Sequence, residues 1–171
     1  MVSTHDERDP SIGPAAATFH HILCAVDFSP CSRRALDHAV HLARELEAEL
    51  ILLHIYQLPT FQYPEGMMPN TVEVMQEVEK RSQAALERWR VVAERELGRP
   101  VRALIEIGTP GRRVAEMAEK LGADVIVLGT HGRTGIKRLL LGSVAERVMR
   151  HAKCPVLTLH SSDDAQPDAA V

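Results

Sequence analysis

The sequence predicts an α/β fold, built as an open parallel β-sheet with helices on both faces. Five short apolar runs alternate along the chain with four segments in which apolar residues recur at helical spacing. Such alternation is typical of βαβ units. The run "DVIVLG" is apolar almost throughout, as expected for a parallel strand that is covered on both faces.

The first predicted strand is His21–Val26, and the helix after it runs from Ser29 to about Glu47. Ser29 followed by Pro30 supplies an N-cap and a proline at the first helical position. The apolar residues that recur in this helix are Leu36, Ala39, Val40 and Ala43. The second predicted strand is Leu50–Tyr56.

A loop, Gln57–Pro69, leads to a long helix, and the sequence leaves the role of this loop open. Asn70 with Glu73 resembles a capping pair at the start of the helix, and Gly98 closes it. Its predicted apolar stripe consists of Met75, Val78, Ala85, Trp89, Val92 and Ala93. The third predicted strand is Val101–Ile107.

Thr109-Pro110 repeats the combination of N-cap and proline, and the helix that it opens ends at Gly122. The predicted buried face of this helix is Val114, Met117, Ala118 and Leu121. The fourth predicted strand is Asp124–Gly129. A helix and a strand complete the fold: Ser143 to about His151, and Pro155–His160.

Composition narrows the class of protein. The net charge of -3 argues against a nucleic-acid binder, because neutralising phosphates needs a basic surface. The longest apolar runs are strand-sized, so we expect no membrane span, and the first stretch has no signal-peptide core. Three cysteines, an odd and sparse set, favour a cytoplasmic protein. We expect a flexible arm at residues 1–18, one domain at 19–160 and a disordered acidic tail at 161–171.

The stretch "GTHGRTGIKRLLLGS", Gly129–Ser143, is a candidate phosphate loop. Its glycines would let backbone N–H groups approach a phosphate, and the helix that opens at Gly142 and Ser143 adds the positive end of a dipole. Arg133, Lys137 and Arg138 bring positive charge. The alternative is a plain connection in which Ser143 caps a helix, and the residues alone favour neither. Neither the P-loop nor the dinucleotide fingerprint fits.

Asp27 ends the first predicted strand, where a carboxylate could accept hydrogen bonds from ribose hydroxyls or a base amine. If strands one and four are neighbours, Asp27 and Gly129 face the same crevice. The alternative for a lone aspartate is a turn residue or a local cap.

Other reactive residues carry weaker signals. Nine histidines include His38 and His41 on one helix face, but no set of four ligands has the tight spacing of a metal site. Cys24 and Cys154 are expected to behave as small apolar residues. A helix N-terminus would favour the thiolate of Cys31, but no resolving partner supports a redox role.

The loop matches G-x2-G-x9-G-[ST], and with its flanks it resembles the universal stress protein family over roughly residues 20–160. The flanks are "HILCAVDFSPCSRRAL", "LILLHIY", "GTPGRRVAEMAEKLGADVIVLG" and "VMRHAKCPVLTL". The resemblance implies a five-stranded parallel sheet in the order 3-2-1-4-5, similar to adenine nucleotide alpha hydrolases. Strands one and four would then lie side by side.

The resemblance also implies an ATP site, with Mg²⁺ accompanying the nucleotide. Asp27 would contact the nucleoside beside Ala25 and Val26, and backbone at Ile55 would contact adenine. The phosphates would be held by Gly129, Gly132, Gly142 and Ser143. The lining would be completed by Thr130, His131, Arg133, Val144 and Ala145. Members of the family often dimerise by pairing last strands, here Val156–His160.

These expectations amount to a nucleotide-dependent regulator of the stress response rather than an enzyme. Hydrolysis should be slow at most, because no activating carboxylate or in-line base is evident. The alternatives are an adenine-nucleotide hydrolase or transferase on the same sheet, or an interaction module that holds no nucleotide. The sequence leaves open the stress, the protein partners, the choice among adenine nucleotides and the purpose of Leu139–Leu141.

Overall fold

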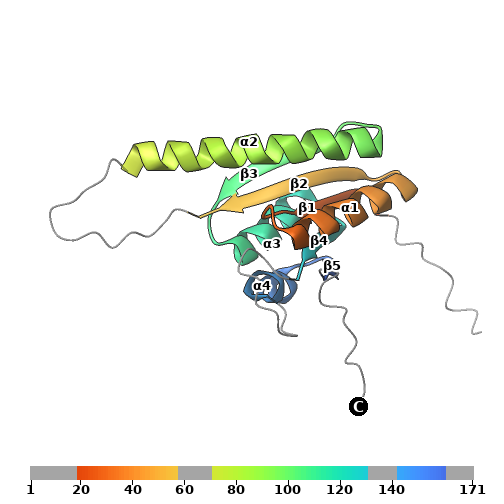
Figure 1. Ribbon diagram of the computed structural model, residues 1–171. Coiled ribbons are helices and arrows are strands. Elements are labelled where there is room, and N and C mark those ends of the chain that lie inside the picture. Colours follow the sequence, from red (N-terminus) through yellow and green to blue (C-terminus); the bar gives the residue numbers. More distant parts are fainter. Residues whose placement is uncertain (1–18, 58–70, 131–141, 161–171) are drawn as a thin grey trace, which may run out of the picture.

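The computed structural model describes residues 19–57, 71–130 and 142–160 (Figure 1). Several predictions therefore lie outside the described residues. These are the arm, the tail, nearly all of the loop before the long helix, and the cap residue Asn70. His131, Gly132, Arg133 and Leu139–Leu141 also lie outside.

Five parallel strands form one sheet in the order β3-β2-β1-β4-β5, which confirms the predicted topology. The strands are β1 (His21–Ala25), β2 (Glu49–Tyr56), β3 (Arg102–Ile107), β4 (Val125–Gly129) and β5 (Val156–Leu159). In the register, Ala25 of β1 lies between Leu53 of β2 and Leu128 of β4. The carboxyl ends of the three central strands therefore meet at one edge of the sheet.

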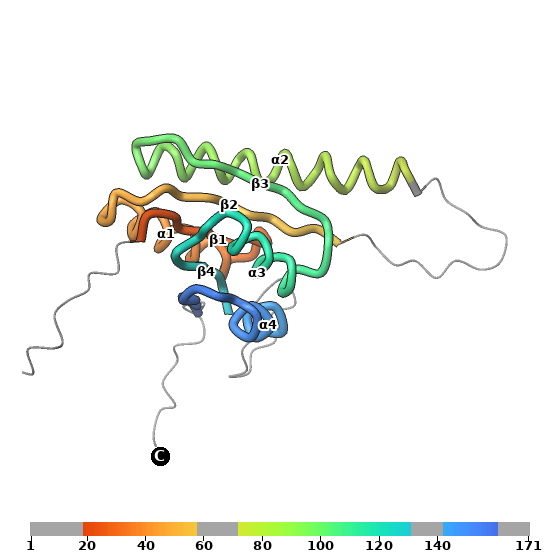
Figure 2. The backbone as a smooth tube through the Cα atoms, turned by 180° about the vertical axis from the view of Figure 1, so that it is seen from behind, coloured from red at the N-terminus to blue at the C-terminus, as the bar shows by residue number. Residues whose placement is uncertain are grey.

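In the described part of the chain, four helices cover the two faces of the sheet (Figures 1 and 2). They are α1 (Pro30–Glu45), α2 (Thr71–Leu97), α3 (Pro110–Leu121) and α4 (Ser143–His151). Helices α1 and α2 pack on one face with alternate strand residues such as Ile22 and Cys24. Helices α3 and α4 pack on the other face with Leu23. Within the described residues, none of these helices is both long and apolar enough to span a bilayer.

The helix termini agree with most of the predicted ends: Gly122 is the left-handed C-cap of α3, Gly98 follows the last residue of α2, and α4 begins at Ser143. The Ser29 hydroxyl accepts a hydrogen bond from the backbone N–H of Ser32, as an N-cap should. Thr109 occupies the N-cap position of α3, but its side chain makes no capping hydrogen bond, so that part of the prediction is wrong. The N-cap of α4 is Gly142, and Ser143 is already the first helical residue.

The buried residues of α2 differ from the predicted apolar stripe. Its buried residues are Leu86, Ala93 and Leu97, two of which the prediction missed. Met75 and Val78 are only half-buried, because the first turns of α2 project past the carboxyl ends of the strands (Figures 1 and 2).

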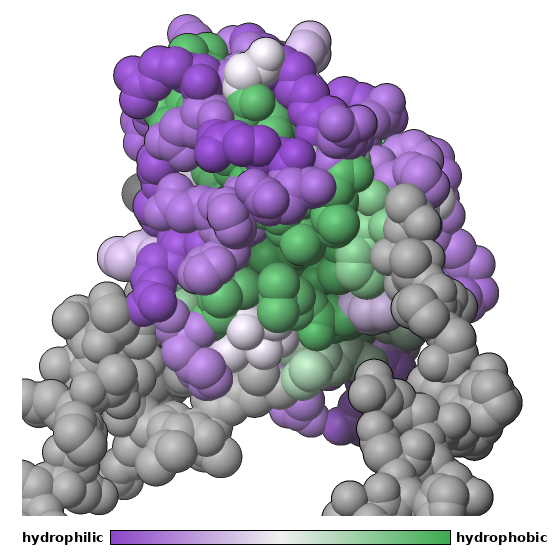
Figure 3. Space-filling model, turned by 90° about the vertical axis from the view of Figure 1, so that its right-hand side faces the viewer, coloured by the Kyte–Doolittle hydropathy of each residue, from purple (hydrophilic) through white to green (hydrophobic). Residues whose placement is uncertain are grey.

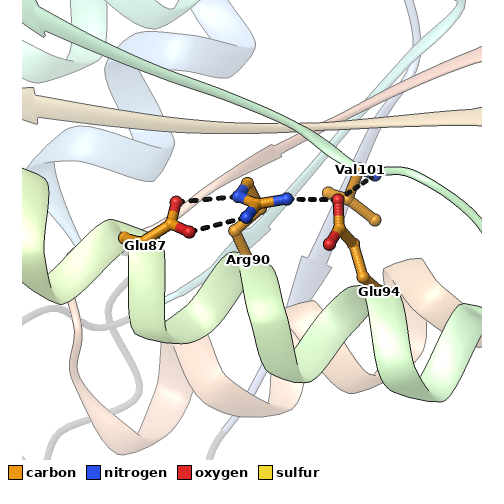
Figure 4. A network of polar contacts seen from close by, with 4 residues as sticks. All are labelled: Glu87, Arg90, Glu94 and Val101. Atoms are coloured by element: carbon orange, nitrogen blue, oxygen red, sulfur yellow. Dashed lines mark hydrogen bonds and ion pairs between the residues drawn. The ribbon is translucent and has the colours of Figure 1, made fainter.

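A polar network fastens the other half of α2 to the start of β3 (Figure 4). Arg90 pairs with Glu87 and Glu94, and Glu94 accepts a hydrogen bond of 3.0 Å from the backbone N–H of Val101. Hydrogen bonding to Arg90 lowers the pKa of the Glu87 carboxyl, and the same bond raises the pKa of the Arg90 guanidinium. The second half of α2 is thus tied to the start of β3.

Candidate functional site

A cavity of about 530 Å³ lies at the carboxyl edge of the central strands. Ten of the thirteen residues that the sequence assigns to the site line it, and the other three lie outside the described residues. The ten are Ala25, Val26, Asp27, Ile55, Gly129, Thr130, Gly142, Ser143, Val144 and Ala145. The fold therefore brings residues from β1, β2, β4 and α4 around one volume.

Asp27 stands where the chain leaves β1 for α1, and it is half-buried. Its Oδ1 accepts two hydrogen bonds from Ser29, from the backbone N–H at 3.0 Å and from the hydroxyl at 2.6 Å. The backbone N–H of Asp27 donates to Ser32 Oγ at 3.3 Å. The turn role and the ligand-facing role, which the sequence sets as alternatives, are compatible in this geometry, because Asp27 also lines the cavity.

Phe28, the next residue, has a φ of 66°, a left-handed conformation that costs about 1 kcal/mol for a residue with a side chain. Its ring packs on His54 at a centroid distance of 4.4 Å, with the two rings tilted by 37°, and meets Trp89 of α2 edge-on at 5.4 Å. The Nδ1 of His54 lies 2.7 Å from the carbonyl oxygen of Val26. These contacts offset the backbone cost and anchor the turn that carries Asp27.

Gly129 packs directly against Cys31 of α1. A Cβ atom at this position would lie 2.8 Å from Cys31 Sγ and 3.0 Å from the Cys31 carbonyl carbon. The Cys31 thiol is buried and donates to the carbonyl oxygen of Leu159 at 3.1 Å. The packing of α1 against β4 therefore favours glycine at position 129, whether or not a ligand is bound.

Thr130 joins the end of β4 to the end of β5. Its backbone N–H and its hydroxyl both donate to the Leu159 carbonyl oxygen, at 2.8 Å and 3.2 Å, and the hydroxyl lies 2.9 Å from His160 Nδ1. The carbonyl oxygen of Thr130 accepts a hydrogen bond of 2.7 Å from the backbone N–H of Gly142. The two described residues that flank residues 131–141 are thus bonded to each other.

The start of α4 supplies the donors that an anion would need. The first backbone N–H groups of a helix have no acceptor within the helix, and the residues that contribute them here are Ser143, Val144 and Ala145. All three line the cavity. The N–H of Gly142 is already bonded to Thr130, so the anion-binding capacity of the described residues rests on the three that follow.

Ten further lining residues escaped the sequence analysis: Ser32, Leu53, His54, Tyr56, Gln57, Val78, Ser82, Pro110, Val114 and Leu128. Ser32 could have been predicted, because it lies three residues after the N-cap Ser29, in the first turn of the helix that follows Asp27. Val78 and Ser82 enter because α2 overhangs the sheet edge, and Val78 was predicted to face the core. Burial, with the nearby Glu79 carboxylate, raises the pKa of Tyr56. Among the described lining residues, Asp27 carries the only charged side chain.

Comparison with known proteins identifies what this architecture resembles. The model of the universal stress protein family matches residues 18–160. The chain is 37% identical over 143 residues to the universal stress protein MJ0531 of Methanocaldococcus jannaschii, a match that covers 82% of each chain.

Two solved structures share the fold. One is the hypothetical protein MJ0577, with 29% identity, a TM-score of 0.74 and coverage of 85% of this chain and 99% of that one. The other is a universal stress protein in complex with cAMP, with 25% identity, a TM-score of 0.66 and coverage of 85% and 99%.

Proposed function

The chain belongs to the universal stress protein family, and from that premise we propose that it binds ATP and acts as a nucleotide-dependent regulator of the stress response. One observation carries the proposal: all ten described residues of the expected site line a single cavity. Its volume of about 530 Å³ falls within the range of about 300–1,000 Å³ that is usual for small-molecule sites. The related protein solved with cAMP supports an adenine nucleotide as the ligand.

A nucleotide needs hydrogen-bond acceptors around its nucleoside and N–H donors around its phosphates, and the cavity contains both kinds of group. Asp27 presents a carboxylate that would accept hydrogen bonds from ribose hydroxyls or from a base amine. The start of α4 presents backbone N–H groups and the positive end of a helix dipole, which favour phosphate. Mg²⁺, when bound with ATP, would neutralise phosphate charge, and the described lining contains oxygen ligands that could contact it, among them the Asp27 carboxylate and the Ser143 hydroxyl.

The composition of the described lining supports a regulatory role. Rapid phosphoryl transfer needs a base or a positioning group for the attacking water. The one carboxylate of the described lining, Asp27, is already held by Ser29. We therefore expect no catalysis beyond slow hydrolysis, with the signal carried by the altered surface of the bound protein.

We further propose that two copies pair through β5 and that the protein works in the cytoplasm. The strand β5 is an edge strand with β4 as its partner in the sheet, and Leu157 on it is 41% exposed. Exposed edges are templates for pairing with another chain. On the side shown in Figure 3, a hydrophobic area lies below a mostly polar upper part of the molecule. The cysteines of the described residues, all free, suit a reducing compartment.

Calorimetric titration tests the proposal, with ATP, AMP and cAMP injected in the presence of Mg²⁺. We expect Asp27→Ala to weaken ATP binding at least about tenfold, because a hydrogen bond to a charged group contributes roughly 1.5–3 kcal/mol. The matched control is Asp37→Ala, which removes an exposed aspartate of α1 that pairs with Arg33. Equal affinity in the two variants would contradict the site, and no binding by the wild type would contradict the function.

Phosphate release, measured on the same samples, separates a regulator from an enzyme. We expect slow release that stays close to the background of the Asp27→Ala protein. Turnover in the wild type well above that background would instead favour a hydrolase on the same sheet.

A further inference from the structure

Ser29 makes a set of contacts that its role as an N-cap does not require. Its backbone N–H and its hydroxyl both donate to the same atom, Oδ1 of Asp27, at 3.0 Å and 2.6 Å. Among the described residues, no donor to the other oxygen, Oδ2, is found. One carboxylate oxygen is therefore held by the protein, and the second is left for whatever enters the cavity.

The hydroxyl of Ser29 has one arrangement that satisfies all of its neighbours. It accepts from the backbone N–H of Ser32 at 3.2 Å, so its single proton is directed to Asp27. Ser32 in turn donates its own hydroxyl to the Ser29 carbonyl oxygen at 3.1 Å. Ser29 is 7% exposed, and water therefore competes poorly for these bonds.

Ser29 acts on the cavity only through its neighbours. Asp27 and Ser32 line the cavity, whereas Ser29 does not. The left-handed turn at Phe28 brings Ser29 back toward Asp27, and the rings of His54 and Trp89 hold that turn in place. The whole segment from β1 to α1 thus presents one carboxylate in one orientation.

We propose that Ser29 is a positioning residue for ligand binding: it holds Oδ1 of Asp27 so that Oδ2 accepts a hydrogen bond from a hydroxyl or amine of the nucleoside. The inference rests on the proposed nucleotide site. An aspartate that is oriented before binding loses less rotamer freedom when the ligand arrives, which corresponds to an affinity gain of roughly two- to tenfold.

The experiment is a double-mutant cycle on ATP affinity, measured by calorimetry in the full chain. Ser29→Ala removes the hydroxyl and also the helix cap. Ser29→Gly removes the hydroxyl, but glycine is an adequate N-cap, so this variant separates positioning from helix stability. Ser29→Thr keeps the hydroxyl and serves as the conservative rescue. Urea unfolding of each variant reports the structural role alone.

We expect Ser29→Ala and Ser29→Gly to weaken ATP binding about two- to tenfold, and Ser29→Thr to bind nearly as the wild type does. In an Asp27→Ala background, the same Ser29 substitutions should leave the affinity unchanged. Equal weakening with and without the Asp27 carboxylate would overturn the inference, because the effect would then be structural. No weakening in the wild-type background, while ATP still binds, would overturn it alone. A wild type that binds no ATP would overturn both this inference and the proposed function.

Discussion

Replacing Gly129 with alanine probes a close packing contact in the lining of the candidate site. The added Cβ would lie 2.8 Å from Cys31 Sγ and 3.0 Å from the Cys31 carbonyl carbon, well inside the separation of about 3.5–4.0 Å at which carbon atoms attract. Inserting a methyl group into a packed core costs about 1–3 kcal/mol. Reduced freedom of the unfolded chain returns about 0.4–1 kcal/mol. We therefore expect Gly129→Ala to lower the free energy of unfolding by about 1–2 kcal/mol.

Urea unfolding followed by the fluorescence of Trp89, the single tryptophan of the chain, measures this loss. The matched control is Gly98→Ala, where a Cβ would meet nothing within 4 Å and where a φ of 78° supplies strain instead. Repeating both substitutions in a Cys31→Ala background tests the cause. Only the cost at Gly129 should fall there, because Sγ is the nearest obstacle.

The fall should be partial, since the Cys31 carbonyl carbon and Cβ, at 3.0 Å and 3.2 Å, remain. A Gly129→Ala protein as stable as the wild type would refute the packing argument. So would a cost at Gly129 that is the same in both backgrounds.

Two further predictions concern charge and assembly. Asp124 ties the start of β4 to β1 by accepting hydrogen bonds from the backbone N–H groups of His20 and His21. Burial alone would raise the pKa of this carboxyl, but the two hydrogen bonds outweigh it, and the pKa is lowered. Its stabilisation is therefore present above the ordinary value of 3.8 and lost as the pH falls through the lower folded value. Asp124→Asn should lower the free energy of unfolding by about 0.5–1 kcal/mol at neutral pH. The urea midpoints of the wild type and the variant should converge as the pH falls, and a difference that stays constant across the acid range would contradict this. Leu157→Asp should convert a dimer to a monomer in sedimentation velocity, whereas Val91→Asp, on exposed α2 surface, should not; a dimer that survives both argues against pairing through β5.

The fold could be predicted because its signals are local. Each strand is a short apolar run, and proline or glycine marks most helix ends, so the alternation can be read without knowing any long-range contact. The same local signals also give errors at single residues. Thr109 sits where a cap belongs, yet its hydroxyl makes no capping bond, and spacing alone cannot distinguish a cap position from a cap interaction.

The site could be predicted only in part, because its walls depend on packing. Asp27 and the start of α4 follow from their places after strands and before a helix. Val78 and Ser82 line the cavity because α2 projects beyond the sheet, which depends on the packing angle of a helix far along the chain. Gly129 shows a second limit of sequence motifs. Gly129 fits a phosphate-loop motif, yet its close packing against Cys31 also favours glycine there, so a motif glycine by itself does not distinguish binding from packing.

The hydrogen bond between Gly142 and Thr130 bears on how this protein can change over evolutionary time. The bond holds the start of α4 at the end of β4 at 2.7 Å, and Thr130 is itself secured to β5. The position of Ser143 is therefore tied, through Gly142 and Thr130, to the ends of both β4 and β5. Selection that keeps the first N–H groups of α4 in place would therefore also act on the ends of these two strands.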